Sequence, residues 1–248
     1  MNLLLVLGLV GSVAAQDTIY PPGVIDRGTY KVYQRGRALG TETFEFDSRG
    51  DSLAIFSEVK QVLPGPDGDM PIEKTAVLVV GSFDYDLRSY RSTLKARGKD
   101  LTRGLVVDDT AFTAYRESST SGGQGDRLAR PPGRHFVLDG QVFVLFDVMC
   151  RDLAGTSFHQ RPVNVILLRD EQDQVTSITA TDMGADTIRW AARPVVARHL
   201  RFSDSYTTFH AWVGPGGTML RLEQDGSGLR VEREPSPPVK RRAEPKPH

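Results

Sequence analysis

The chain has 248 residues, and its 31 Lys and Arg balance 31 Asp and Glu, so the formal net charge is zero. A balanced charge gives no electrostatic basis for binding nucleic acid or an anionic lipid surface. With 39% hydrophobic residues the chain can build a large core, but a single cysteine excludes an intramolecular disulfide. The lone thiol, Cys150, is expected to be a small buried apolar residue.

Residues 1–15 have the features of a signal peptide. They contain no charged side chain, and the apolar run Leu3 to Val10 is followed by small residues that fit a cleavage site before Gln16. The run is shorter than the roughly 20 residues that cross a bilayer as a helix. The chain is therefore expected to be exported. Its shortage of asparagine is typical of a high-GC bacterial genome, which favours the bacterial periplasm or an outer-membrane-associated location.

Residues 16–26 are predicted to form an extended lead-in, because the pair Pro21 and Pro22 is incompatible with a helix. From 27 to 234 the chain is predicted to be one antiparallel β domain. The segment Tyr30 to Phe46 alternates its side chains at period two around a glycine turn, as a β-hairpin does. The candidate strands before the helix lie near 28–36, 39–47, 52–63, 72–81, 84–97, 103–108 and 110–117.

Two segments depart from simple alternation. Ala76 to Val80 is apolar at every position, which predicts a strand that is covered on both faces or faces an apolar partner. Ser118 to Arg134 is polar and rich in glycine, which predicts a mobile loop.

One amphipathic helix is predicted near 140–153. Apolar residues recur there at the i, i+4, i+7, i+11 spacing of one helix face: Val142, Phe146, Met149 and Leu153. Asp139 is expected to cap the start and Gly155 to close the end. Asp147 and Arg151, one turn apart, are expected to pair.

Further strands are predicted near 162–169, 174–182, 186–193, 195–203, 206–213, 218–224 and 229–234. The resulting fold class is mainly β: a single curled or closed antiparallel sheet of roughly a dozen strands, a barrel or half-barrel, with the helix packed at its mouth. Residues 235–248 have no apolar period and are rich in Pro, Lys and Arg, which predicts a disordered basic tail.

The sequence Gly50-Asp51-Ser52-Leu53 matches the signature of the GDSL esterases and lipases. In that family the serine opens a helix, whereas here the residues after Leu53 alternate as a strand. The family also needs a histidine three residues after an aspartate, and no histidine of this chain has that spacing. The four residues, with the overlapping adhesion tripeptide Arg49-Gly50-Asp51, are therefore predicted to form a β-turn.

The histidines show none of the short ligand spacings of zinc sites, so no metal site is predicted. His210 and Trp212 share a strand face, which ordinary cross-strand packing explains. No phosphate-binding or dinucleotide motif is present, and no cofactor is predicted.

A transmembrane barrel is the alternative architecture, because several candidate strands have the required length. Charged residues such as Glu58, Lys60 and Arg91 lie in mid-strand on the faces that would contact lipid. They favour a soluble periplasmic protein instead.

Two hairpins, Tyr30 to Phe44 and Trp212 to Glu223, resemble those of a group of uncharacterised exported bacterial proteins, which are β-rich domains of unknown function. The resemblance spans most of 27–234 and rests on hairpin motifs, not on catalytic ones. In architecture alone, a curled sheet with one helix is similar to the periplasmic lipoprotein-carrier folds. That similarity implies acyl chains held between a half-barrel and a helical lid.

The leading hypothesis is a binding or carrier protein for an apolar, lipid-like ligand, without catalytic residues. The alternative is that the same side chains simply fill a core. The residues predicted to lie on the inner surface are Phe44, Phe46, Leu78, Val80, Phe143, Phe146, Met149, Trp190 and Trp212.

A second hypothesis is a structural or protein-interaction component of the envelope. Its contacts would be the 118–134 segment and the basic tail, which could meet anionic lipid or peptidoglycan. A third, less favoured hypothesis is an enzyme such as a hydrolase, with acid and base residues brought together only by the fold. The oligomeric state is left open.

Overall fold

The computed structural model describes residues 21–65, 68–119, 122–170 and 172–235. The predicted signal peptide, residues 16–20 of the lead-in and all but the first residue of the predicted tail lie outside this part of the chain. The described residues form one sheet, one α-helix, α1 (Val144–Ala154), and a short 3-10 turn, η1 (Pro215–Gly217). None of their helices is long and apolar enough to cross a bilayer.

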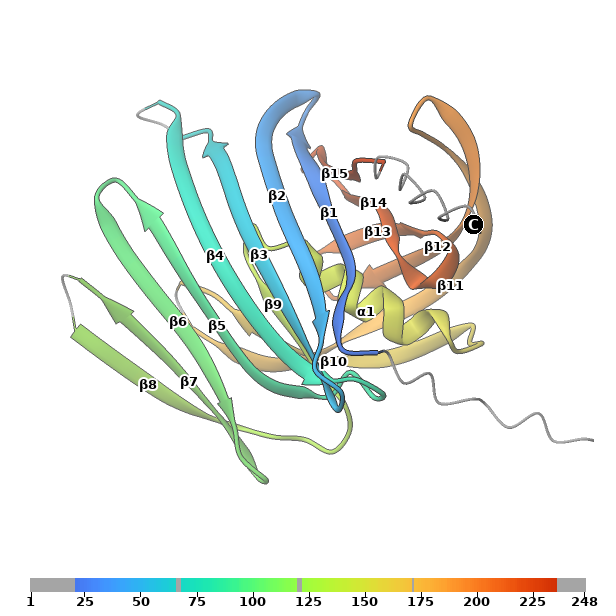
Figure 1. The fold of residues 1–248 in the computed structure, drawn as a ribbon. Helices are drawn as coiled ribbons and strands as arrows, with labels where there is room; N and C mark the ends of the chain where they lie inside the picture. The colour runs from blue at the N-terminus through green and yellow to red at the C-terminus, as the bar shows by residue number, and fades with distance from the viewer. Residues whose placement is uncertain (1–20, 66–67, 120–121, 171, 236–248) are drawn as a thin grey trace, which may run out of the picture.

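The sheet has fifteen strands (Figure 1). Those before the helix are β1 (Gly23–Gln34), β2 (Arg37–Ser48), β3 (Ser52–Leu63), β4 (Met70–Gly81), β5 (Leu87–Ala96), β6 (Lys99–Val107), β7 (Ala111–Ser118), β8 (Gly122–Ala129) and β9 (His135–Asp139). Those after it are β10 (Gln160–Leu168), β11 (Gln174–Trp190), β12 (Arg193–Ser203), β13 (Thr208–Val213), β14 (Met219–Gln224) and β15 (Leu229–Arg233).

Sequence neighbours pair throughout the two halves of the sheet, β1 to β8 and β9 to β15, and β1 joins the halves by pairing with β15. Every pairing is antiparallel except that of β9 with β10, which is parallel. Strands β8 and β9 are the two edges of the sheet, so it curls around the helix without closing (Figure 1). The predicted fold class is confirmed in its open form. The parallel strand β9 was not predicted.

The alternation of each strand divides an inner from an outer face. On β4, Ile72, Leu78 and Val80 are buried, whereas Val77 is 37% exposed. Coverage of 76–80 on both faces is therefore wrong, and the alternative, that the strand faces an apolar partner, stays a prediction. Valine fits a pleated, half-exposed surface because of its β-branched side chain, so an apolar residue there does not require burial.

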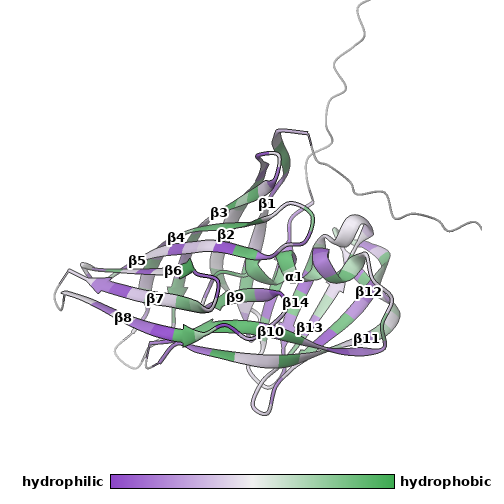
Figure 2. Cartoon of the chain, turned by 90° about the horizontal axis from the view of Figure 1, so that it is seen from below, coloured by the Kyte–Doolittle hydropathy of each residue, from purple (hydrophilic) through white to green (hydrophobic). Residues whose placement is uncertain are grey.

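The prediction that 118–134 is a mobile loop is also wrong. It contains β8, which pairs with β7 from Ala111 opposite Ala129 to Ser118 opposite Gly122. Glycine can take part in a ladder because the hydrogen bonds come from the backbone. Figure 2 shows that β8 is largely hydrophilic, as is usual for an edge strand.

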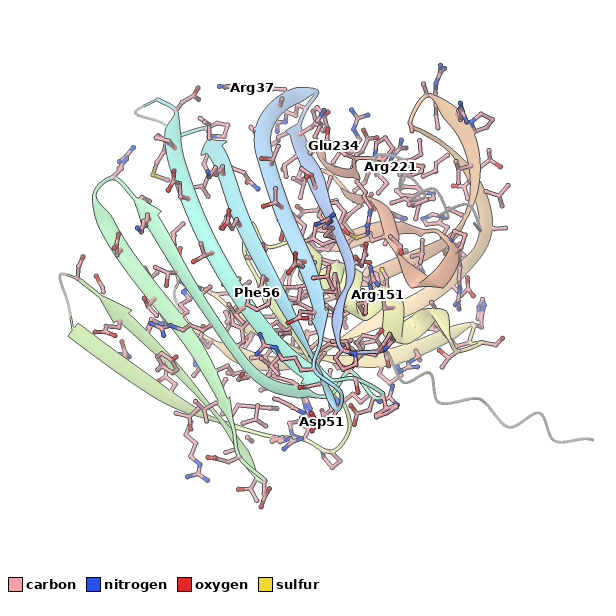
Figure 3. The ribbon with its side chains drawn as sticks, in the orientation of Figure 1. Arg37, Asp51, Phe56, Arg151, Arg221 and Glu234 are labelled. Atoms are coloured by element: carbon pink, nitrogen blue, oxygen red, sulfur yellow. The ribbon has the colours of Figure 1, made fainter. Side chains whose placement is uncertain are left out.

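Two further predictions concern turns and strand limits. Residues 49–51 form the turn between β2 and β3, with Gly50 at φ +84°, so a turn is confirmed here, whereas Ser52 and Leu53 of the predicted turn already belong to β3. Asp51, labelled in Figure 3, binds Arg88 at 2.9 Å. The strands predicted at 174–182 and 186–193 are one strand, β11, with a bulge between Asp182 and Gly184. A bulge keeps the ladder continuous while it bends the strand.

Helix α1 packs inside the curl and is hydrophobic along most of its length (Figure 2). Its pairing of Asp147 with Arg151 at 3.2 Å and its C-cap Gly155 confirm two predictions. The predicted N-cap is wrong: the helix begins at Val144, and Asp139 is instead the last residue of β9. Glu42 of β2 binds the N-terminus of the helix instead.

Candidate ligand-binding site

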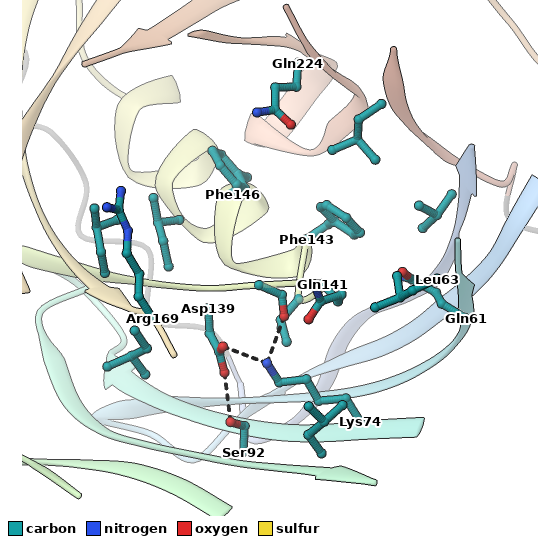
Figure 4. A pocket seen from close by; sticks show the side chains of 18 of the residues that line it. Gln61, Leu63, Lys74, Ser92, Asp139, Gln141, Phe143, Phe146, Arg169 and Gln224 are labelled. Atoms are coloured by element: carbon teal, nitrogen blue, oxygen red, sulfur yellow. Dashed lines mark hydrogen bonds and ion pairs between the residues drawn. The ribbon is translucent and has the colours of Figure 1, made fainter. Parts of the chain in front are cut away.

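A cavity of about 680 Å³ lies between the inner face of the sheet and α1 (Figure 4). Its volume falls within the roughly 300–1,000 Å³ typical of small-molecule sites. Most of its wall is apolar and comes from both halves of the sheet as well as the helix. The apolar lining includes Leu39, Leu63, Ile72, Leu94, Leu101, Leu138, Phe143, Phe146, Leu167, Phe202 and Phe209.

Polar side chains form one part of this wall. Gln61 of β3 lies opposite Ile72 of β4, so Gln61 and Lys74 are diagonal neighbours on the same face. Ser92 of β5 lies directly opposite Arg103 of β6. Four successive strands thus contribute one polar residue each to the cavity.

Asp139 is the acceptor at the centre of this polar wall. Its carboxylate accepts hydrogen bonds from Lys74 Nζ at 2.6 Å, Tyr90 Oη at 2.7 Å and Ser92 Oγ at 2.8 Å. Arg103 lies 3.9 Å away. The parallel pairing of β9 ends at Asp139 and delivers its carboxylate to strands β4 to β6. A buried carboxylate needs such partners, because an unpaired charge is costly in an apolar interior. We call Lys74, Tyr90, Ser92, Arg103 and Asp139 the cavity cluster.

Burial controls protonation in the cavity cluster. It lowers the pKa of Lys74 from its ordinary value, and the nearby Asp139 carboxylate opposes that effect. It raises the pKa of Tyr90 well above its usual range, so the phenol remains a hydrogen-bond donor. Lys74 also donates to the carbonyl oxygen of Gly140 at 2.8 Å, which joins the cluster to the turn before α1.

Glu42 holds the start of the helix from the neighbouring wall. Its fully buried carboxylate accepts hydrogen bonds from Ser57 Oγ at 2.7 Å and from the backbone N–H groups of Phe143 at 2.8 Å and Val144 at 3.2 Å. The free N–H groups of a helix N-terminus favour such an acceptor. Burial raises the pKa of Glu42 to about 7, although these hydrogen bonds act in the opposite direction. The contact fixes Phe143 at the cavity wall.

A second charged group, the helix anchor, consists of Asp26, Asp147, Arg151 and Arg233. Asp147 accepts a hydrogen bond from the backbone N–H of Met219 at 2.7 Å. Arg151, labelled in Figure 3, contacts both Asp147 and Asp26, and Arg233 donates to the two oxygens of Asp26 at 2.6 and 3.0 Å. The anchor ties α1 to β1, β14 and β15, and none of its side chains lines the cavity.

The predicted inner-surface residues divide into three groups. Phe143 and Phe146 line the cavity. Five others are buried in the same core cluster without lining it: Phe44, Phe46, Leu78, Val80 and Met149. Their proposed role in ligand binding remains a prediction.

The placement of Trp190 and Trp212 on the inner surface was wrong. Both pack in a separate cluster with Ile188, Ala197 and Leu220. On β13 the buried inner residues are Ala211 and Val213, so the intervening Trp212 points to the opposite face. Its Nε1 donates to Asp186 at 2.8 Å, and Trp190 Nε1 donates to the carbonyl oxygen of Arg233 at 2.7 Å.

The cavity cluster and Glu42 were missed from the sequence. One signal was present: on β4, Lys74 occupies the same phase as the buried Ile72 and Ala76. A charged residue in the apolar phase of a strand indicates an inward charge that needs a partner. Nothing local identifies that partner as Asp139, which lies 65 residues further along the chain.

Two of the histidines, His199 and His210, lie beside Trp212. His199 Nε2 lies 2.8 Å from His210 Nδ1, and the His199 ring stacks on Trp212 with ring centroids 4.7 Å apart. Across the described residues, no group of three or more His, Cys, Asp or Glu side chains could hold a metal ion.

Comparisons with known proteins give a likeness in fold only. No family model and no curated protein matches the chain. The structure is similar to that of a β-barrel-like protein of the domain of unknown function DUF1849 from Brucella abortus, with a TM-score of 0.55 and 9% identity over 88% of this chain and 97% of that chain. A DUF1089 family protein from Pseudomonas aeruginosa also matches, with a TM-score of 0.48 and 11% identity over 85% and 98%.

The predicted resemblance to uncharacterised β-rich domains is thus confirmed at the level of the fold. At 9% identity the likeness carries no site residue from one protein to the other.

Proposed function

We propose that the chain is an exported protein of the bacterial envelope that binds an apolar, lipid-like ligand in the cavity between the sheet and α1. The observation that supports this function best is the cavity itself, about 680 Å³ of space with a largely apolar lining. A largely apolar cleft of this size can bury most of the surface of a small ligand.

The helix supports the proposal because polar contacts hold it in place. Glu42 binds its first turn, and Asp26, Arg233 and the backbone N–H of Met219 bind Asp147 and Arg151 further along the helix. These bonds keep Phe143 and Phe146 at the wall of the cavity and prevent the helix from collapsing into it.

The direct test is mass spectrometry of an organic extract of the mature protein, purified from an envelope fraction without detergent. We expect a lipid or isoprenoid in stoichiometric amount. A clean extract, together with a failure to bind added lipid, would contradict the proposal.

Filling the cavity offers a second test with a matched control. Ala96 lines the cavity, whereas the adjacent Lys95 is exposed on the other face of β5. We expect Ala96→Trp to weaken binding of the neutral fluorescent probe N-phenyl-1-naphthylamine by about tenfold, since one large ring removes much of the buried contact area. Lys95→Trp should leave the affinity unchanged. Equal effects of both substitutions would argue against binding in this cavity.

Export is tested separately by fractionation and by the mass of the mature N-terminus. We expect cleavage after Ala15, so that Gln16 becomes the first residue. A full-length chain in the cytoplasm would refute export without bearing on the cavity.

A further inference from the structure

We infer that the ligand carries an acidic head group, a carboxylate or a phosphate, which accepts hydrogen bonds from Gln61, Lys74 and Arg103 in the cavity wall. We call these three residues the donor row. The inference rests on the proposed function and names the chemical class of its ligand.

Gln61 has an unpartnered side-chain donor at the cavity wall. Its side chain lines the cavity, the residue is only 4% exposed, and its amide nitrogen has no hydrogen-bond partner. Buried polar groups in native proteins are nearly always paired, so an orphaned amide at a cavity wall indicates a partner that comes from outside the chain. An amide N–H donates, and the missing group is therefore an acceptor.

Lys74 has one more donor than it has acceptors among the described residues. Its ammonium has three N–H donors, of which Asp139 and the carbonyl oxygen of Gly140 accept two. Asp139 already accepts from three side chains, so the protein supplies many donors and few free acceptors at this wall.

Charge is the third observation. Among the cavity-lining residues that the structure describes, the buried ionisable side chains are Lys74 and Arg103, which are positive, and Asp139, which is negative. Arg103 also contacts Asp170, but that carboxylate is 90% exposed. Water screens an exposed charge much more than a buried one. Among the buried side chains alone, the positive charges therefore exceed the negative ones by one, and the exposed Asp170, which is hydrogen-bonded to Arg103, supplies the balance. An anionic head group would compete with Asp170 for Arg103.

The apolar lining completes the description of the ligand. Leu63 and Ile72 flank Gln61 and Lys74 on the same strand faces, and Phe143 and Phe146 face the cavity from the helix side (Figure 4). A molecule that satisfies both kinds of wall has an acidic end and a hydrocarbon chain.

The test compares four probes that share one chain: hexadecanoic acid, hexadecyl phosphate, hexadecan-1-ol and hexadecylamine. Each displaces N-phenyl-1-naphthylamine from the purified mature protein. We expect at least one acid to bind at least tenfold more tightly than the alcohol, and the amine to bind most weakly. The ratio of the two acids then distinguishes a carboxylate from a phosphate source.

The decisive variant is Gln61→Leu, with Lys60→Leu as its control. Gln61 has no partner to lose, so the substitution should leave the fold intact. Lys60 is the adjacent residue on the exposed face of β3, and its removal tests whether any nearby positive charge matters. We expect Gln61→Leu to weaken acid binding about tenfold with the alcohol unchanged, and Lys60→Leu to change neither.

A second variant, the double substitution Lys74→Met and Asp139→Asn, removes the buried ion pair as a unit and leaves Arg103 as the buried charge of the wall. We expect it to reduce the preference for acids while the alcohol still binds, because Arg103 and Gln61 remain as donors. Alcohol binding as tight as that of both acids, or tightest binding of the amine, would overturn the head-group inference while the proposed function stands. An unchanged affinity for both acids in Gln61→Leu would likewise overturn the head-group inference and leave the proposed function standing. Failure of all four probes to bind would overturn both.

Discussion

The two buried charged groups of this protein differ in a way that separates structure from ligand binding. The helix anchor contains two acids and two guanidinium groups, and each acid contacts both guanidinium groups. Asp147 also accepts a hydrogen bond from a backbone N–H. The cavity cluster contains two buried cations and one buried acid, and it faces open space. In the anchor, each charged side chain is paired with an opposite charge of the same group. In the cavity cluster, Lys74 keeps one N–H donor without a partner in the part of the chain that the structure describes.

The anchor has one unpaired atom, Arg151 Nε, and it does not weaken the contrast. The Arg151 guanidinium lies 4.1 Å from the centre of the Phe46 ring, a cation–π contact that stabilises the charge. Gln61, by comparison, has an unpartnered amide directly at the cavity.

The largest effect is expected for Asp147→Ala in the anchor. The substitution leaves Arg151 without its partner on the helix and the backbone N–H of Met219 without an acceptor. Breaking a buried pair from one side costs about 3–5 kcal/mol, and we expect a loss of that size in the free energy of unfolding measured with urea. Asp225→Ala, at an exposed carboxylate, is the control. A loss below about 1 kcal/mol would show that the anchor is dispensable.

A smaller loss is expected for Lys74→Met in the cavity cluster. Asp139 keeps Tyr90 and Ser92 as donors, and the cavity can admit water to its carboxylate. We expect a loss of about 2–3 kcal/mol in the same urea titration, since the remaining partners and water reduce the cost of the unpaired charge. Adding Asp139→Asn should recover most of it. No recovery in the double variant would mean that the ion pair is not the source of the effect.

The pH dependence of stability tests Glu42, which lies between the two groups. Burial raises its pKa from the ordinary value of 4.5 to about 7 on folding, so the folded state binds the proton more tightly than the unfolded state. The stabilisation is therefore fully present below pH 4.5 and is lost as the pH rises through 7. We expect the free energy of unfolding to fall by about 2 kcal/mol between pH 5 and pH 8, since each pKa unit corresponds to about 1.4 kcal/mol.

Glu42→Gln is the matched variant for that experiment. Its amide oxygen can still accept from the first turn of the helix, but the group no longer titrates. We expect the slope of stability against pH to flatten between pH 5 and pH 8. An unchanged slope would assign the dependence to another group.

The smallest expected effect is that of Gln61→Leu on stability, and it sharpens the comparison most. Since the amide has no partner within the chain, its replacement by an apolar group should change the free energy of unfolding by less than about 1 kcal/mol, in the stabilising direction. Thermal and urea unfolding both report this quantity. A loss of more than about 2 kcal/mol would mean that Gln61 has a structural role, which is the role that the anchor residues have.

Some of this architecture was readable in the sequence because it depends on local spacing. The period of two identified most strands, and the 3.6-residue period identified α1. The Asp147–Arg151 pair and the Gly50 turn were also predictable, since a spacing of four along a helix and the four residues of a β-turn determine the geometry locally.

The tertiary structure decided the rest, because the deciding contacts join residues that are far apart in the chain. Lys74 and Asp139 are 65 residues apart, and Glu42 reaches the backbone of Phe143 across 101. Alternation shows that a strand has two faces but not which of them turns inward, and this is why Trp212 was placed on the wrong side. The edge strand β8 pairs with β7, and the parallel strand β9 pairs with β10. Both pairings are made by backbone groups, so the side-chain pattern does not predict them. The sequence by itself therefore determined the elements of this protein, and only their assembly decided that a cavity exists and which polar groups face it.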